Sequence, residues 1–347
     1  MEKFSARTSD PIWVGVDDGH YMVKAIGQGN AFSMLSSVAP GKQGGNIGIG
    51  GKGEVTVYTT PEGAWSVGDS ILKPHDTRIP DYPHHPIARV LIHHALSKMG
   101  YGGKEVHIVT GLPVGRYFGA TGEPAARLIE AKTKNILDGG IGGGTGDGIA
   151  TIVEHGVLAQ GAAVYFDLIM DEYGKKLYAN NSKSRLARDQ SYGIVDIGGR
   201  TIDCLVINAG RVALQQTTDY GVLYLEDDVK SALCERFDRL DVPRIMVQDA
   251  LDTGICSFFG QPENVEDLVA PLKEAFTERV LSAAEVCFGE QVMSLERIVC
   301  AGGGARLLGD AFNKKWRNGE ILRGAEFSNA RGMYKFGKYV IGAQRKD

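Results

Sequence analysis

The sequence lacks the features that mark secreted and membrane-spanning proteins. Its five cysteines among 347 residues are odd in number and show no C-x-x-C spacing. We therefore expect buried thiols in a reducing compartment. The first ten residues are polar and no long apolar run follows them. Neither a targeting segment nor a membrane span is predicted, and we expect a cytoplasmic protein.

An excess of positive charge is also missing. The chain has 38 Lys and Arg against 42 Asp and Glu, which leaves a net charge of −4 with neutral histidines. Strong non-specific attraction to nucleic-acid phosphates is therefore not expected, and we predict no direct nucleic-acid binding. The length of 347 residues exceeds one ordinary core of roughly 150 residues and predicts two domains.

What the sequence does contain is a strand–turn–strand pattern within residues 192–212. A short apolar run ends in Asp196, the pair Gly198 and Gly199 follows, and a second apolar run covers residues 202–207. The β-branched content and the turn residues predict a hairpin. Glycines at its tip let backbone N–H groups approach an anion, and a carboxylate at the end of a buried strand can hold hydrated Mg²⁺ beside phosphates. The hairpin therefore predicts a metal–nucleotide site.

The same pattern occurs near the N-terminus, over residues 12–26. In the two hairpins the corresponding residues are Asp17 and Asp196, Gly19 and Gly198, Val23 and Ile202, and Lys24 and Asp203. A motif repeated once per half predicts two related lobes that face one ligand. Lys24 would neutralise phosphate, and Asp203 would add a carboxylate for the metal.

Two further stretches are candidates for the same site. Gln160 precedes small residues and an expected helix. A glutamine cannot take a proton at neutral pH, but it can orient a nucleophilic water. An apolar strand at 297–301 runs into Gly302, Gly303 and Gly304. Glycines there would let a flat ring or a sugar lie against bare backbone.

Other glycine-rich stretches favour plainer interpretations. Residues 139–148 contain GGGTG, the core of the phosphate loop of tubulin-like GTPases, but a helical pattern precedes it and a β-like run follows. Because that loop needs a strand before it and a helix after it, we interpret the stretch as a surface turn. Residues 41–53 are expected to form an exposed loop within a small β-rich insertion at about 31–75. Helices are expected at 87–99, 125–137, 223–237, 266–288 and 330–342.

The order of these motifs resembles the superfamily of actin, the large heat-shock chaperones and the sugar kinases. Within it the chain looks most like the ParM/StbA plasmid-segregation actins. The likeness is carried by VDDGHYMVK at 16–24, YGIVDIGGRTIDCLVINAG at 192–210 and IVCAGGGARLL at 298–308, and it runs nearly end to end. It implies an α/β, two-lobed actin-like fold, which is a duplicated ribonuclease H-like fold with a nucleotide cleft between the lobes.

The resemblance also implies a domain division and an activity. The first lobe would comprise 11–188 and 330–347, and the second lobe 189–329. The cofactors would be ATP and Mg²⁺, with hydrolysis by in-line attack of water, and GTP stays open as a substrate. The chain would assemble with itself into nucleotide-dependent filaments and move plasmid DNA through a DNA-binding adaptor of the ParR type, bound to a centromere-like site.

Carried over position by position, the resemblance implies a set of site residues. Asp17 and Asp196 would hold the hydrated Mg²⁺, and with Gln160, which would position the attacking water, they are the expected catalytic residues. The expected nucleotide contacts are Asp18, Gly19, His20, Lys24, Gly198, Gly199, Arg200, Thr201, Lys230, Gly302, Gly303 and Gly304. His20 and Tyr21 stand where relatives usually have small residues. For Arg200, a phosphate contact and a solvent-facing position both stay open.

Two other functions stay open from the sequence. A small-molecule kinase of the same superfamily would pass the γ-phosphate to an acceptor. Kinases usually need a carboxylate base at the acceptor, and Gln160 cannot serve as one, which argues against transfer. A filament scaffold with a chromosomal or organelle-positioning role would carry the same motifs.

Overall fold

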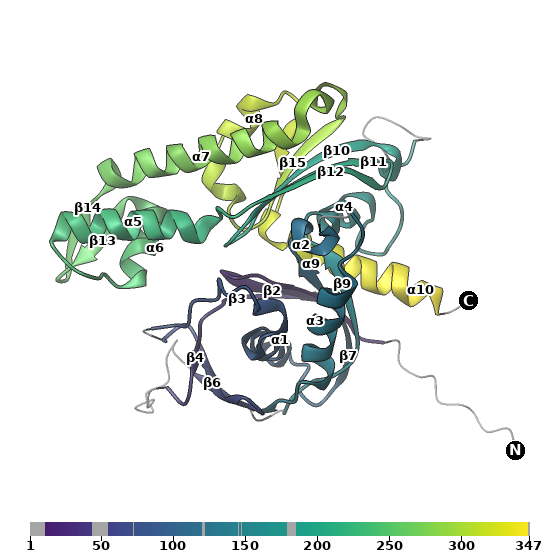
Figure 1. Cartoon of the computed structure of the whole chain (residues 1–347), viewed down its shortest axis with the longest axis horizontal. Coiled ribbons are helices and arrows are strands. Elements are labelled where there is room, and N and C mark those ends of the chain that lie inside the picture. Colours follow the sequence, from purple (N-terminus) through teal and green to yellow (C-terminus); the bar gives the residue numbers. More distant parts are fainter. Residues whose placement is uncertain are drawn as a thin grey trace, which may run out of the picture.

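The computed structural model describes residues 11–43, 55–71, 73–119, 122–144, 146, 148–178 and 185–345. The chain forms two α/β lobes, each built on a five-stranded sheet (Figure 1). The expected two-lobed α/β fold is confirmed. The expected loop at 41–53 lies largely outside the described residues.

The first sheet has the strand order β3-β2-β1-β7-β9. Its strands are β1 (Trp13–Asp18), β2 (Met22–Gly27), β3 (Asn30–Leu35), β7 (Glu105–Leu112) and β9 (Thr151–Ala159). β1 and β2 form an antiparallel hairpin, whereas β7 runs parallel to β1 and β9 runs parallel to β7. The carboxyl ends of β1, β7 and β9 therefore meet at one edge of the sheet, where β1 ends in two carboxylates.

A smaller sheet, in the order β4-β6-β5-β8, stands opposite the first one. Its strands are β4 (Val38–Pro40), β5 (Thr56–Thr60), β6 (Gly63–Val67) and β8 (Gly142–Gly143). The expected insertion was thus placed correctly only in part, because β3 pairs with β2 in the first sheet. The stretch at 139–148 also does more than turn, since β8 pairs with β5. Gly143 has φ +84°, and a Cβ there would lie 2.7 Å from the Val57 carbonyl oxygen, so the pairing needs glycine.

Helix α1 (Pro86–Lys98) lies between these two sheets, at the centre of the ring they form in Figure 1. Every residue of α1 except Lys98 is buried. The small sheet covers the side of the helix that faces away from the first sheet. Arg89, a buried residue of this helix, pairs with Glu62 at 2.8 Å.

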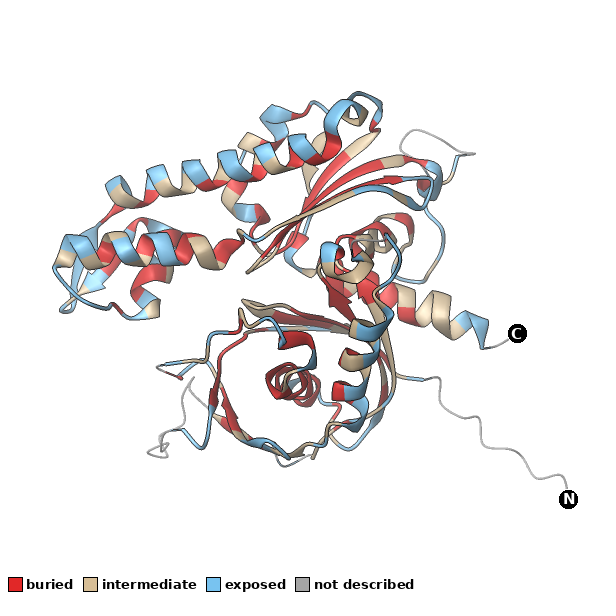
Figure 2. Ribbon diagram, viewed as in Figure 1, coloured by how far each residue is buried: buried red, intermediate tan, exposed pale blue. Residues whose placement is uncertain are grey.

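The second sheet has the order β12-β11-β10-β15-β16. Its strands are β10 (Ser191–Ile197), β11 (Ile202–Asn208), β12 (Arg211–Thr218), β15 (Arg297–Ala301) and β16 (Gly319–Ile321). The second lobe also contains α5 (Val222–Phe237), α6 (Arg244–Thr253), α7 (Glu266–Phe288), α8 (Ala311–Lys315), and the hairpin of β13 (Ile255–Phe258) and β14 (Gln261–Asn264). Figure 2 shows that α5 and α7 turn buried faces toward each other and toward the sheet and exposed faces outward. The expected helix at 266–288 is confirmed.

The remaining helices differ in the elements that they contact. They are α2 (Val114–Phe118), α3 (Ala126–Asp138), α4 (Ala162–Ile169), α9 (Ser328–Phe336) and α10 (Gly342–Gln344). Helix α9 returns from the second lobe and packs on β1 and α4. A Cβ on Gly15 would lie 2.1 Å from the Ala330 carbonyl oxygen, and one on Gly332 would lie 1.8 Å from that of Ala163, so this packing depends on glycine. The residue boundaries of the two lobes stay a prediction.

The two hairpins correspond as the sequence predicts. Asp17 is opposite Lys24 in the β1–β2 register, and Asp196 is opposite Asp203 in the β10–β11 register. Each first strand also has a parallel neighbour, β7 for β1 and β15 for β10. The repeat is therefore structural as well as sequential.

Two expectations about the whole chain concern cysteines and membranes. All five cysteines are free thiols, and all except Cys234 are buried. In the described part of the chain, no helix combines the length and the apolar character that a membrane crossing requires.

Candidate functional site

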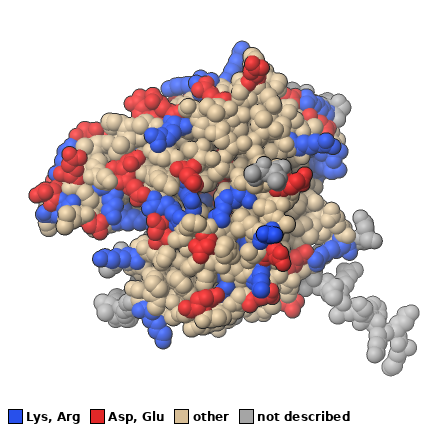
Figure 3. All heavy atoms as spheres, viewed as in Figure 1, with Lys and Arg blue, Asp and Glu red and all other residues tan. Residues whose placement is uncertain are grey.

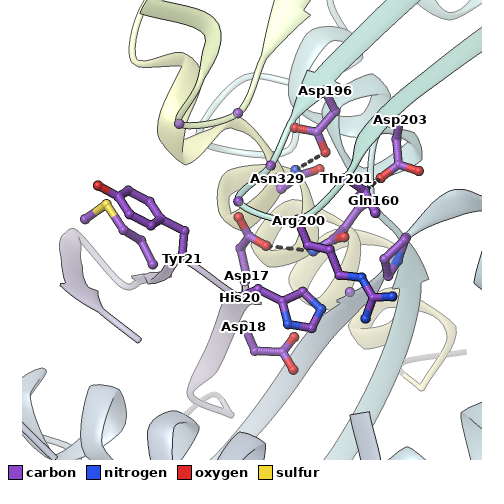
Figure 4. Close-up of a pocket in the computed structure, with 18 of the residues that line it drawn as sticks. Asp17, Asp18, His20, Tyr21, Gln160, Asp196, Arg200, Thr201, Asp203 and Asn329 are labelled. Carbon is purple, nitrogen blue, oxygen red and sulfur yellow. Dashed lines mark hydrogen bonds between the residues drawn. The ribbon is translucent and has the colours of Figure 1, made fainter. Parts of the chain in front are cut away.

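A cavity of about 50 Å³ lies where the two hairpin turns meet (Figure 4). The predicted residues that line it are Asp17, Asp18, Gly19, His20, Lys24, Gln160, Asp196, Gly198, Gly199, Arg200, Thr201, Gly302, Gly303 and Gly304. The structure therefore brings together residues that are up to almost 290 positions apart in the chain. In the space-filling view, Lys and Arg side chains gather along the groove between the lobes (Figure 3).

Asp196 is the carboxylate that enters the cavity from the end of β10. Its residue is 4% exposed, and its Oδ2 accepts a 2.7 Å hydrogen bond from Nδ2 of Asn329. Its Oδ1 is buried and has no hydrogen-bond partner among the described residues. Burial, together with the negative charges of Asp17 and Asp203, raises the pKa of Asp196 to about 7. This arrangement leaves one carboxylate oxygen available to a cation or a proton.

Asp17 enters from the other hairpin, at the corresponding place on β1. Lys24 Nζ lies 3.5 Å from its Oδ2, and Nε2 of Gln160 donates a 2.9 Å hydrogen bond to its Oδ1. Gln160 itself stands in the turn after β9, and its backbone N–H donates to the Leu112 carbonyl at 2.8 Å. Asp17 is therefore oriented by two side chains whose positions are fixed by separate strands.

Glycines form two sides of the cavity. Gly302 follows β15 with φ +84°, and a Cβ there would lie 2.4 Å from the Ile197 carbonyl oxygen and 2.6 Å from Oδ1 of Asp196. In the second hairpin turn, the Gly198 N–H donates to the Thr201 carbonyl at 2.9 Å. Gly199 lies directly against the first turn, because its Cβ would be 2.3 Å from Cβ of Tyr21. The two turns thus touch through a glycine.

Two predicted carboxylates, Asp18 and Asp203, accept hydrogen bonds from other residues of the protein. Both oxygens of Asp18 accept hydrogen bonds from Lys132 Nζ, at 2.9 and 2.6 Å, so a nucleotide contact by Asp18 gains no support. Asp203 accepts from Thr217, from Thr201 at 3.1 Å and from the Val114 N–H at 3.2 Å. Burial raises the pKa of Asp203 to about 6 in spite of these bonds. The expectation that Asp203 supplies a carboxylate to the metal stays a prediction, and these hydrogen bonds give it no support.

His20 and Arg200 tie the turns to a loop of the first lobe. His20 Nδ1 lies 2.5 Å from the Thr77 carbonyl oxygen, and Thr77 Oγ1 donates back to the His20 carbonyl at 2.5 Å. Burial lowers the pKa of His20 to about 4, so the ring is neutral at pH 7. Arg200 Nε lies 3.2 Å from Oδ1 of Asp219, and its NH1 donates to the Arg78 carbonyl at 3.2 Å. Arg200 therefore bridges to the first lobe at the rim of the cavity.

Lys230 is the predicted residue that the structure does not bring to the cavity. It lies on α5, and its Nζ pairs with Oδ1 of Asp241 at 2.6 Å. Both side chains are largely solvent-exposed. We do not carry Lys230 into the proposed site.

Several cavity residues were missed by the sequence analysis. Asn329 connects the two lobes, since it accepts from the Gly161 N–H at 3.0 Å and donates to Asp196. Lys132 donates to Asp18 and, at 2.6 Å, to the Gly111 carbonyl. Neither residue belongs to a local motif, because each comes from a helix distant in sequence from its partners. In the sequence they are one lysine and one asparagine, and their burial is visible only in the folded structure.

A second cavity, of about 270 Å³, adjoins the first on the side of the second lobe. Tyr21, Val222 and Gly303 line both cavities. Its walls come mainly from α5, α6 and the segment after Gly304, and they include polar side chains such as Glu226. The two cavities together form an elongated site that is acidic and glycine-rich at one end and mixed apolar and polar at the other.

Comparisons with known proteins agree with this architecture. Residues 15–162 match the family model described as the N-terminal domain of actin-like proteins, and residues 194–314 match the C-terminal model of the archaeal, MreB-like actin homologues. No curated protein matches the chain significantly.

Solved structures resemble the whole chain. A 15-stranded ParM filament from Clostridium botulinum matches with a TM-score of 0.76 and 17% identity, over 95% of this chain and 99% of that chain. A non-polymerisable quadruple mutant of pCBH ParM matches with a TM-score of 0.74 and 19% identity, over 94% and 99%. An archaeal actin homolog in complex with ADP matches with a TM-score of 0.72 and 18% identity, over 94% and 99%. The two family matches, taken with this shared two-lobed fold, place the chain in the actin-like superfamily.

Proposed function

We propose that this protein is an ATPase that binds Mg·ATP in the cleft and assembles with itself in a nucleotide-dependent way. The observation that carries the proposal is the pair of acidic strand ends, with Oδ1 of Asp196 buried, unpartnered among the described residues and facing the same cavity as Asp17. A divalent cation would neutralise both groups. Carboxylates that contact the ion through water suit Mg²⁺, which retains several waters and is shared with substrate phosphates.

The glycine turns support a phosphate ligand next to that cation. Gly19 and Gly198 stand at the tips of the two hairpins, and both line the cavity. Lys24 adds a buried ammonium group at 7% exposure. Bound Mg²⁺ would supply charge neutralisation for the phosphates, and the protein would contribute position and orientation. The second cavity, beyond Gly303, would then receive the nucleoside.

Gln160 is the residue that we assign to the attacking water. Its amide nitrogen donates to Asp17, so its carbonyl oxygen is the end that can accept a hydrogen bond from a water molecule. Such an acceptor orients a nucleophile without becoming protonated. Catalysis would consequently depend on the position of Gln160 more than on its acidity.

The relatives support self-assembly and a cellular role as proposals. The similar solved structures include ParM and Alp12 filaments and an archaeal actin homolog with ADP. By analogy, we infer that this chain forms filaments of a ParM/StbA type, which segregate plasmid DNA in the cytoplasm through a ParR-type adaptor. In this proposal the adaptor recognises DNA and the filament supplies movement.

Phosphate release and light scattering, followed in parallel, test the proposal. The purified protein is mixed with Mg·ATP, Mg·GTP, Mg·ADP or no nucleotide, over a range of protein concentrations. We expect scattering and phosphate release with Mg·ATP, and loss of both in Asp196→Asn. If no nucleotide changes the scattering or the sedimentation of the protein, the filament proposal is wrong. If phosphate is released without assembly, the ATPase assignment stands alone.

A further inference from the structure

Tyr21 reaches from the first lobe to the second. It stands in the turn between β1 and β2, and Figure 4 shows its ring directed away from the carboxylates of the phosphate end. The guanidinium carbon of Arg244, on α6, lies 5.0 Å from the centre of the Tyr21 ring. Gln248 Nε2, one turn further along α6, lies 3.4 Å from the Tyr21 hydroxyl. A residue of a predicted phosphate turn is thus held by a helix of the opposite lobe.

The polar groups around Tyr21 are incompletely paired, and one of them, Glu226, is buried. Glu226, on α5, is 6% exposed, and its Oε2 lies 3.3 Å from NH2 of Arg244. Its Oε1 has no hydrogen-bond partner within the described part of the chain. Burial and the charge of Glu226 raise the pKa of the Tyr21 hydroxyl to about 12, so the phenol stays neutral. A buried carboxylate with a free oxygen normally has a hydroxyl or amide donor to bind.

Tyr21 also stands at the boundary between the two cavities. It lines both of them, and the other residues that do so, Val222 and Gly303, belong to the second lobe. Its Cβ lies against Gly199, so the backbone of the second turn limits its position on that side. A ligand that extends from the glycine turns into the second cavity must therefore pass the Tyr21 side chain.

We propose that Tyr21 competes with the nucleoside part of the nucleotide for the second cavity. Its ring and hydroxyl contact Arg244 and Gln248 and face Glu226, the groups that would otherwise be available to nucleoside hydroxyl and amine groups. Binding of a nucleotide requires the side chain to leave these partners. The inference rests on the proposed nucleotide function, which it deepens by naming the residue that limits affinity.

Competition of this kind makes a prediction opposite to that for a ligand-binding residue. If only a fraction of the protein molecules has the conformation that binds the ligand, the apparent affinity equals the intrinsic affinity multiplied by that fraction. Tyr21→Phe removes the hydroxyl and keeps the ring, and should tighten ADP binding about threefold to tenfold. Tyr21→Ala also removes the contact with Arg244 and should tighten it by about tenfold or more. Tyr178→Phe, which alters an exposed tyrosine outside both cavities, should leave it unchanged.

Calorimetric titration with unlabelled ligands tests the proposal, at protein concentrations where light scattering shows no assembly. Mg·ADP, adenosine and Mg·pyrophosphate are titrated into the wild type and the three variants, whose folding is checked by thermal unfolding. We expect the Tyr21 variants to gain affinity for ADP and adenosine but not for pyrophosphate.

The outcomes are distinguishable. If the wild type and all variants bind neither ADP nor pyrophosphate, the proposed function is wrong. If the wild type binds ADP but Tyr21→Ala binds it equally or more weakly, Tyr21 does not compete. An equal gain for pyrophosphate would mean that the substitution loosens the whole cleft, and it would also overturn the inference. Tyr21→Phe keeps the test valid if Tyr21→Ala fails to fold.

Discussion

Gln160 donates its side-chain amide to Asp17 over 2.9 Å, which joins the turn after β9 to the end of β1. The sequence suggested two separate roles for these residues, one for water and one for metal. In the structure they form one unit, because the orientation of each depends on the other. Lys24, on the opposite side of Asp17, completes the restraint.

We therefore predict that Gln160→Ala slows hydrolysis about 100-fold, because a residue that orients the reacting water is typically worth that much. Nucleotide affinity should change little, since the amide contacts Asp17 and not a phosphate in our proposal. Single-turnover phosphate release, with ADP affinity as a separate readout, measures both. Asn30→Ala, a change of one amide at the outer end of the β2–β3 hairpin, serves as the control. Hydrolysis at the wild-type rate in Gln160→Ala would show that the water assignment is wrong.

The sequence predicted the parts of the site that belong to local repeats. Asp17 and Asp196 could be matched because each lies near the end of the first strand of a β-hairpin. The turn residues of each hairpin can be recognised within about ten residues. Asn329 and Lys132 were not found, because their roles depend on helices that fold back over large sequence separations. Lys230 was placed in the site by the resemblance alone, and in the structure its Nζ pairs with Asp241 outside both cavities.

The fold was predictable to a similar depth. Helix α7 was expected at the observed residues because its apolar spacing persists over a long segment. The strand β8 was not expected, because two glycines carry no β propensity and pair with β5 only through close backbone approach. Likewise, α1 is buried on all sides because the small sheet covers it, and no local sequence pattern predicts this cover.

Asp196→Asn should abolish hydrolysis and yet stabilise the nucleotide-free protein above neutral pH. The pKa of Asp196 is raised to about 7 in the folded state from 3.8, so the folded protein binds the proton more tightly than the unfolded chain. Its contribution to stability is present below pH 3.8 and is lost as the pH rises through 7. At pH 8 the variant should gain on the order of 2–4 kcal/mol. Urea unfolding at pH 8 and at pH 5 measures it, and an equal effect at both values would contradict the assignment.

Asn329→Asp should be more damaging than Asn329→Ala. Alanine removes the donor to Asp196 and the acceptor for the Gly161 N–H, which should cost about 1–3 kcal/mol through groups left unpaired. Aspartate keeps the acceptor but places a second negative charge beside Asp196. It should therefore lower the free energy of unfolding further, at pH 8 and without Mg²⁺. Urea unfolding and phosphate release of both variants provide the comparison. If aspartate proves the milder substitution, the bridge does not act through the charge of Asp196.

Buried neutral histidines should make the fold sensitive to acid. Burial lowers the pKa of His93, on α1, to about 4 from 6.5. The unfolded chain therefore takes up a proton first, and this contribution to stability is lost progressively as the pH falls from 6.5 to 4. His93→Leu should reduce the loss of unfolding free energy between pH 6.5 and pH 4 by about 3 kcal/mol. His84→Leu, at an exposed position, should leave this loss unchanged. Unfolding free energies at pH 7 and pH 4.5 decide between them.

Gly302→Ala and Gly309→Ala separate backbone strain from crowding in the segment that follows β15. Both glycines have positive φ, +84° and +49°, so alanine costs about 1 kcal/mol of strain at each. At Gly302 the added Cβ would also lie 2.4 Å from a backbone carbonyl oxygen, whereas nothing lies within 4 Å at Gly309. We expect Gly302→Ala to lose an additional 1–3 kcal/mol or so and to bind ADP more weakly. Thermal unfolding and ADP titration measure the two effects, and similar losses for both variants would mean that the strand end beside Asp196 yields to accommodate the methyl group.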